Sequence, residues 1–225
     1  MNELIFVLQI VLMVGALFWA SKLGKEALIA LCVLLAVMAN LFVLKQMLIA
    51  GWNVSCSDAF AIGSIFGLNM ITQAYGREAA KKTIWISFFG MVFFAALSQV
   101  HLLFTPSPAD TSHPHFAFLL YVTPRLLVAS LATFFLVQQL DVRLYGFFQK
   151  KFSGWSWRTR STVCLFISQA FDTVLFSLLG LYGMFQELTS MIVVSYLVKC
   201  AVIGLTSMVA GFYDPLKKLM EKETV

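Results

Sequence analysis

Apolar residues gather in seven long runs along the chain, and polar residues gather in the short stretches between the runs. A membrane-spanning helix needs about 20 mostly apolar residues, and the runs approach or exceed that length, the first being the shortest. The pattern predicts an all-α fold, a polytopic membrane helical bundle with seven spans, in a single domain over residues 1–225. The predicted spans are 4–20, 27–49, 58–75, 83–104, 116–140, 161–183 and 189–213.

Composition supports a lipid environment. Hydrophobic residues make up 60% of the chain and charged residues 12%, and mean hydropathy is +0.86. A soluble domain carries about 25% charged residues, so this chain has too much apolar surface for water. The pI of about 9.1 would suit a nucleic-acid partner, but the basic residues lie between apolar runs rather than on one face. We therefore expect the lipid bilayer, and no nucleic acid, as a partner.

Lysine and arginine follow the loops in alternation. Residues 21–26, 76–82, 141–160 and the tail after 213 hold two, three, five and three of them, thirteen of the sixteen in the chain. Basic residues mark the cytoplasmic loops of membrane proteins. The pattern predicts an odd number of spans, with the N-terminus outside and the C-terminus inside. Glu3, with no basic residue before it, favours a retained first helix over a signal peptide.

Three charged residues lie inside apolar runs: Arg125, Asp172 and Lys199. A charge in the bilayer core is costly and indicates a functional site, usually with a partner. At a rise of about 1.5 Å per residue, Asp172, Lys199 and Asn69 each lie roughly 15–16 Å along their spans, near the midplane of a core about 30 Å thick. We expect these three to line one buried polar chamber. The alternative is a plain salt bridge or hydrogen-bond clamp between the last two spans.

Arg125 opens a different question. Thr123 and Pro124 directly before it are typical of the N-cap and first position of a helix. A helix is therefore predicted to begin there, with residues 116–122 forming a separate kinked or re-entrant piece. The Arg125 side chain either extends to the outer headgroups or faces inward, toward a substrate or Asp172.

Other polar residues lie near these positions. Gln73 is one turn after Asn69, and Gln169 precedes Asp172 by three residues and shares its face. Asp58 begins the third span, where it either caps the helix or attracts a cation. A further group is expected at the cytoplasmic end of the fifth span, as interface residues or as an inner gate. Its members are Gln138, Gln139 and Asp141.

No catalytic residue emerges from the sequence. The four cysteines show no paired or zinc-ligand spacing, and His113 and His115 stand in a loop without further ligands. Nucleophile, phosphate-binding and metalloprotease motifs do not occur. We expect no enzyme activity, no metal and no cofactor.

Four segments together resemble a known family. They are "LNMITQAYGREAAKKTI" (68–84), "RLLVASLATFFLVQQLD" (125–141), "SQAFDTVLF" (168–176) and "YLVKCAVI" (196–203). In order and spacing, over about residues 58–213, they are similar to the queuosine precursor transporters, integral membrane proteins of the vitamin-uptake-transporter type.

The resemblance implies a multi-pass protein of the cell inner membrane that imports 7-deazaguanine bases for queuosine salvage in tRNA. The base would be queuine or a nitrile or aminomethyl precursor. It also implies a six-helix core like that of the substrate-binding membrane components of energy-coupling-factor vitamin importers, to which the first span here is an addition. The chain departs from the family in Asn69, where an acidic residue is frequent, and in Gln73, where a charged residue is frequent.

A 7-deazaguanine presents a donor edge that a carboxylate accepts well, and Asp172 is the expected acceptor. Asn69 and Gln73 both donate and accept, which suits the remaining ring atoms, and Lys199 or Arg125 would keep Asp172 ionised. With Gln169, these six form the predicted substrate site. Two alternatives stay open: a binding subunit of an energy-coupling-factor-type vitamin importer that needs a separate energising module, and a non-transport membrane scaffold.

Overall fold

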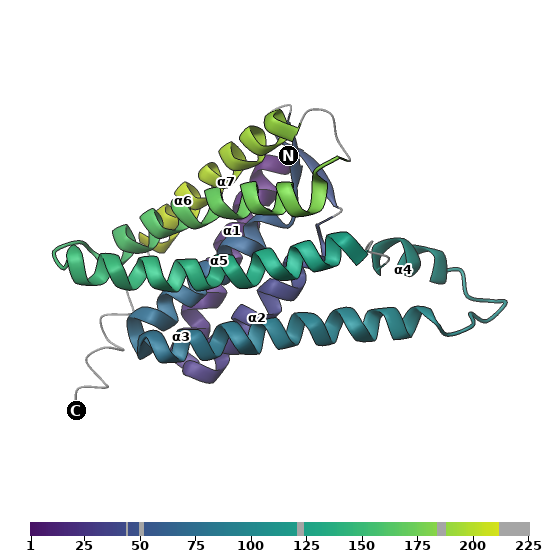
Figure 1. The fold of residues 1–225 in the computed structure, drawn as a ribbon, viewed down its shortest axis with the longest axis horizontal. Coiled ribbons are helices and arrows are strands. Elements are labelled where there is room, and N and C mark those ends of the chain that lie inside the picture. Colours follow the sequence, from purple (N-terminus) through teal and green to yellow (C-terminus); the bar gives the residue numbers. More distant parts are fainter. Residues whose placement is uncertain (44, 50–51, 121–123, 184–187, 212–225) are drawn as a thin grey trace.

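The computed structural model is a helical bundle, and it describes residues 1–43, 45–49, 52–120, 124–183 and 188–211 (Figure 1). The all-α class predicted from the apolar runs is confirmed. The helices are α1 Asn2–Leu23, α2 Lys25–Leu41, α3 Asp58–Leu102, α4 His113–Leu120, α5 Pro124–Lys151, α6 Trp157–Phe176 and α7 Leu188–Gly211. A π-helical turn, η1 Ser177–Leu181, extends α6, and a small antiparallel hairpin joins β1 Gln46–Ile49 to β2 Trp52–Ser55.

Four of the described helical stretches are long and apolar enough to cross a membrane. They are Asn2–Leu23, Asp58–Leu102, Trp157–Gly180 and Ile192–Ala210. Large apolar side chains on the outside of the bundle, such as Leu12, Phe89 and Leu197, are more than half exposed, and lipid is the solvent that accommodates them. The protein is therefore an all-α membrane protein, while the count of seven spans and their orientation stay predictions.

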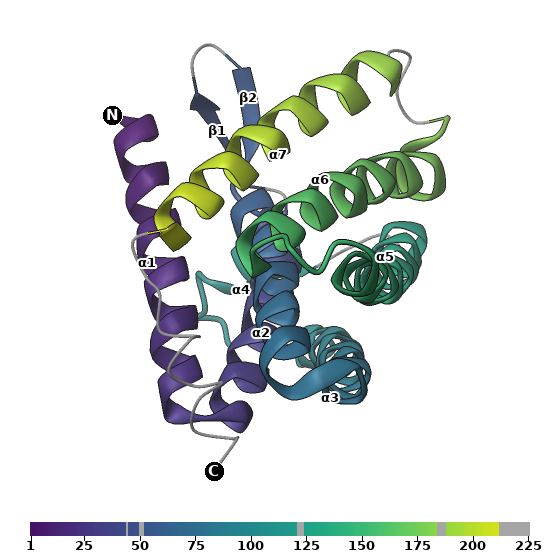
Figure 2. The same cartoon turned by 90° about the vertical axis from the view of Figure 1, so that its left-hand side faces the viewer.

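α3 contains two helices joined at Gly76. This residue has φ 81° and ψ 173°, a backbone conformation that is accessible almost only to glycine. The bend separates residues 58–75 from 77–102, which correspond to the third and fourth predicted spans, and Figure 2 shows the two halves running in different directions. The second half lies beside α5 in both views.

The predicted second span, 27–49, is too long. α2 ends at Leu41, and residues 46–49 form strand β1, in which Met47 pairs with Val54. Hydropathy could not separate the two elements, because residues 46–49 continue the apolar run while pairing as a strand.

The fifth predicted span, 116–140, is divided as expected. α4 ends at Leu120 and α5 begins at Pro124, the position in a first turn where proline loses no hydrogen bond. α5 then continues to Lys151, ten residues past Asp141. Of the two roles predicted for Asp141, the interface residue does not fit, because this extension places the side chain inside the bundle with 0% exposure, and the inner gate stays a prediction.

α1 and α2 pack against the first half of α3 through small residues. Gly63 and Gly67 are spaced as in the Gly-xxx-Gly pattern that brings membrane helices close together. A Cβ atom on Gly67 would lie 2.5 Å from Cys32 Sγ of α2 and 2.9 Å from a Leu17 methyl carbon of α1. The first helix is thus part of the apolar core.

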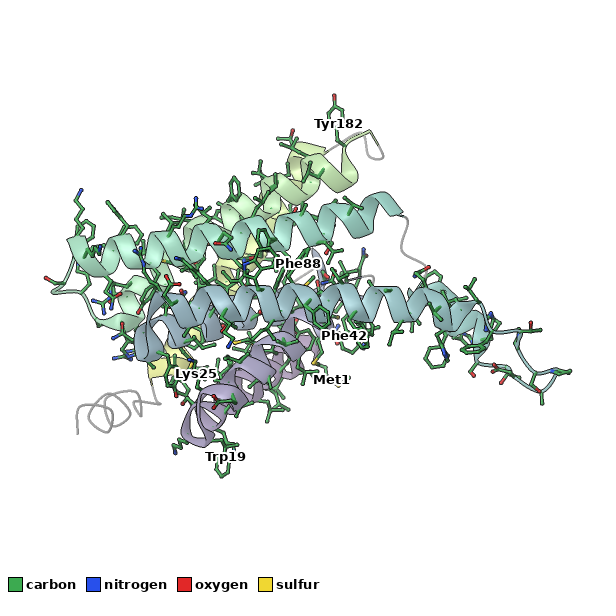
Figure 3. The ribbon with its side chains drawn as sticks, turned by 60° about the horizontal axis from the view of Figure 1, so that its bottom comes forward. Met1, Trp19, Lys25, Phe42, Phe88 and Tyr182 are labelled. Carbon is green, nitrogen blue, oxygen red and sulfur yellow. The ribbon has the colours of Figure 1, made fainter. Side chains whose placement is uncertain are left out.

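The basic loops gather at one end of the molecule. Lys25, in the first turn of α2, lies with its Nζ 5.8 Å from the centre of the Tyr75 ring, next to the bend in α3. Arg77 donates a hydrogen bond to the Arg143 carbonyl of α5 at 3.2 Å. Trp19 and Tyr182 point away from the bundle (Figure 3) and are 65% and 66% exposed, as aromatic residues are at membrane interfaces.

Candidate functional site

A polar stripe follows one face of α6. Ser161, Ser168 and Asp172 are separated by seven and four residues, a spacing that keeps them on one side of a helix. Each side chain contacts a different neighbouring helix: Ser161 contacts α3, Ser168 contacts α5 and Asp172 contacts α7. The stripe is about 16 Å long at the rise of an α-helix, which is half the thickness of a hydrocarbon core.

Asp172 and Lys199 form an ion pair at one end of this stripe. Lys199 Nζ donates to Asp172 Oδ2 at 2.6 Å. The Lys199 side chain is 7% exposed and the Asp172 side chain 23%, so the lysine is the more deeply buried of the two. The structure brings together the two opposite charges expected to meet between the last two spans.

Asp58 is a third charge at the same place. It lies buried at the start of α3, and its carboxylate interacts electrostatically with both Lys199 and Asp172. One ammonium group thus interacts with two carboxylates, one of them through the ion pair, and the three groups carry a net negative charge when all are ionised. The sequence had suggested a cap or a cation site for Asp58 without joining it to the other two.

Asn69 lies at the other end of the stripe. Its Nδ2 donates to Ser161 Oγ at 3.1 Å, eleven residues before Asp172 on α6, a separation of about 16 Å along the helix. Asn69 therefore lies at a different level of α6 from the ion pair, and the expectation that Asn69, Asp172 and Lys199 line one buried chamber stays a prediction.

Asp141 of α5 joins the stripe between these ends. Ser168 Oγ donates to Asp141 Oδ1 at 2.7 Å, and the side-chain amide of Asn69 also interacts with this carboxylate. Asn69, Asp141, Ser161 and Ser168 are all completely buried, and we call these four residues the inner polar cluster. Reading the chain by hydropathy missed the cluster, although the spacing of the two serines from Asp172 was a usable signal.

Two glutamines predicted for the site lie apart from each other. Gln73 Oε1 accepts hydrogen bonds from the Tyr145 hydroxyl at 2.9 Å and from the Arg160 guanidinium at 3.2 Å, near the basic end of the molecule. Gln169, directly after Ser168, is 0% exposed, and neither its amide nitrogen nor its oxygen has a hydrogen-bond partner in the described part of the chain.

Arg125 lies in the first turn of α5, but its side chain is outside the described part of the structure, so its inward or outward direction stays a prediction. Gln138, expected beside Asp141 at the interface, is instead buried and donates to Ser64 Oγ of α3 at 3.3 Å. The described residues hold no group of three or more potential metal ligands.

Two comparisons identify relatives of the chain. Residues 58–212 match the family described as "Putative vitamin uptake transporter". The chain is also 27% identical over 192 residues to a protein of Bacillus subtilis (strain 168) named "Probable queuosine precursor transporter", covering 83% of this chain and 82% of that one. No solved structure matches.

Proposed function

The chain belongs to the family of vitamin uptake transporters and is a multi-pass membrane transporter, and from this premise we propose that it imports 7-deazaguanine precursors of queuosine across the inner membrane. The name of the Bacillus subtilis relative supports the choice of cargo, and the four segments similar to queuosine precursor transporters agree with it. The substrate would be queuine or one of its nitrile or aminomethyl precursors.

The polar stripe on α6 is the observation that carries this proposal. A buried row of hydrogen-bonding groups is costly in a membrane bundle that needs only packing. Here the row is shared by α3, α5, α6 and α7. Such a row offers a polar small molecule successive partners through the apolar core, which a protein built only as a scaffold does not need.

In this proposal Asp172 and Lys199 form the outermost binding position on the transport route. The Asp172 side chain is 23% exposed, and Lys199 donates a hydrogen bond to it at 2.6 Å. Gln169 of α6 and Asn69 of α3 come next along the route, and Gln73, held by Tyr145 and Arg160, closes it at the basic end. Arg125, from the first turn of α5, would meet the substrate at the outer face.

Complementation in living cells tests the cargo. The chain is expressed in cells that lack both queuosine synthesis and uptake, each 7-deazaguanine base is supplied separately, and queuosine in tRNA is measured. We expect queuosine to appear with at least one base and to remain absent with an empty vector. Cells that express the protein in the membrane and gain no queuosine from any base would refute the proposed cargo.

Reconstitution separates a complete transporter from a binding subunit. Purified chain alone in liposomes should accumulate or equilibrate labelled base. Binding of the base without uptake would instead assign the chain to the class of importer subunits that need an energising module.

A further inference from the structure

The inner polar cluster contains hydrogen-bonding capacity that the protein does not use. Oδ2 of Asp141 and Oδ1 of Asn69 are buried and have no hydrogen-bond partner among the described residues. Both side chains are 0% exposed. Buried polar atoms in folded proteins are nearly always satisfied, so each exception calls for an absent partner such as a water, an ion or a ligand.

The two unpartnered atoms are both acceptors, and they come from neighbouring side chains on α5 and α3. Asp141 Oδ1 is already held by Ser168 at 2.7 Å, and Asn69 Nδ2 by Ser161 at 3.1 Å. The Asn69 amide also approaches the Asp141 carboxylate, so the two side chains are neighbours, and Asp141 Oδ2 and Asn69 Oδ1 have no hydrogen-bond partner among the described residues. A ligand that satisfies both must present at least two donors close together.

Asp172 is less suited to that task. Its Oδ2 is bonded to Lys199 at 2.6 Å, so a base that used both carboxylate oxygens would have to displace an ammonium group. None of the salt bridges among the described residues involves Asp141. A buried carboxylate without a counter-charge gains most from donors supplied by a ligand.

We propose that Asp141 and Asn69 form the subsite that binds the donor edge of the transported base, the N1–H and 2-amino groups of a 7-deazaguanine. The inference rests on the proposed function and moves base recognition from Asp172 to Asp141. Asp141 is bonded to Ser168, which precedes Asp172 by four residues, about 6 Å along α6. Gln169, directly after Ser168, has a free donor and a free acceptor in the described part of the chain and complements the carbonyl of the same ring.

Binding of two bases to the purified full-length chain tests this assignment. 7-Deazaguanine carries both donors, and 7-deazahypoxanthine lacks the 2-amino group. Losing a hydrogen bond to a charged group lowers affinity roughly tenfold or more. We expect the wild-type protein to bind 7-deazaguanine more tightly than 7-deazahypoxanthine by about that factor. In Asp141→Asn, the affinity for 7-deazaguanine should fall strongly and the affinity for 7-deazahypoxanthine much less. The ratio of the two affinities should therefore come close to one.

Asp110→Asn is the matched control, because it removes a carboxylate from an exposed loop and should leave both affinities unchanged. A ratio that stays at the wild-type value in Asp141→Asn would overturn the subsite. So would a wild-type protein that binds both bases equally well, a comparison that needs no variant. If the wild-type protein binds neither base, the proposed cargo itself fails, and the subsite fails with it.

Discussion

Lysine 199 shows how a single residue constrains this membrane protein. Its ammonium group is buried, forms an ion pair with Asp172 and interacts electrostatically with Asp58. The charge is tolerable there only because the carboxylates compensate for lost hydration. Removing one member of such a group costs more than the group contributes as a whole, because the remaining charge stays buried.

We predict that Lys199→Met lowers the free energy of unfolding by about 3 kcal/mol, since Asp172 and Asp58 lose their shared counter-charge. Thermal unfolding of the purified protein in detergent measures the effect. The exposed Lys22, in the last turn of α1, provides the control Lys22→Met, which should change stability very little. In a double-mutant cycle, Asp172→Asn should recover part of the loss. Fully additive effects would show that the pair is not coupled.

The residues of the site were only partly predictable. Asp172 and Lys199 stood out because charges inside apolar runs demand partners, and the structure does pair them. Asp141 was not predicted for the substrate site, because it ends an apolar run and fitted either an interface residue or an inner gate. It is buried because α5 continues past it to Lys151, and helix length beyond an apolar run is not visible in hydropathy.

At the scale of elements, close packing of α3 on α1 and α2 determines where the polar residues of α3 lie. Gly63 and Gly67 allow this approach, and Ser64 between them donates to the Cys32 carbonyl of α2 at 3.2 Å. Asn69 lies two residues after Gly67 on α3. A shift of α3 would therefore change the alignment of Asn69 with Ser161.

Gly67→Leu should destabilise the protein by about 2 kcal/mol, because the added side chain must displace Cys32 and Leu17 in a packed core. Gly204→Leu is the matched control: Gly204 is also helical and has no atom within 4 Å of where its Cβ would lie. The two variants are compared by thermal unfolding and by the fraction of monodisperse protein after extraction. Equal loss in both would mean that the α3 contact contributes nothing specific.

At the scale of the whole molecule, the basic loops occupy one end. The turn from α1 to α2, the bend at Gly76 and the region around Arg143 and Arg160 contact one another. At the opposite end, Asn2 Nδ2 donates to the Leu48 carbonyl of the hairpin at 3.0 Å. This separation is what the positive-inside rule requires of a protein with a single orientation.

The orientation follows as a prediction. A cysteine at Ser107 should react with a membrane-impermeant maleimide in intact cells, whereas a cysteine at Lys81 should react only after permeabilisation. Both positions are exposed, and Cys56→Ser provides the background by removing a native thiol at the outer end. Labelling in the reverse order would show that the basic end faces outward.

The sequence alone determined the solvent, the helical class and the break before Pro124, because these follow from the length of apolar runs and from the missing N–H of proline. It also identified the charges that need partners. Only the tertiary structure decided which polar groups meet. Helices that pass one another can slide by several turns without changing their hydropathy, and the actual offset of α3 against α6 places Asn69 beside Ser161 and Asp58 near Asp172. Gly63 and Gly67 of α3 pack against Met13, Leu17 and Cys32 of α1 and α2, contacts that the sequence of α3 alone does not contain.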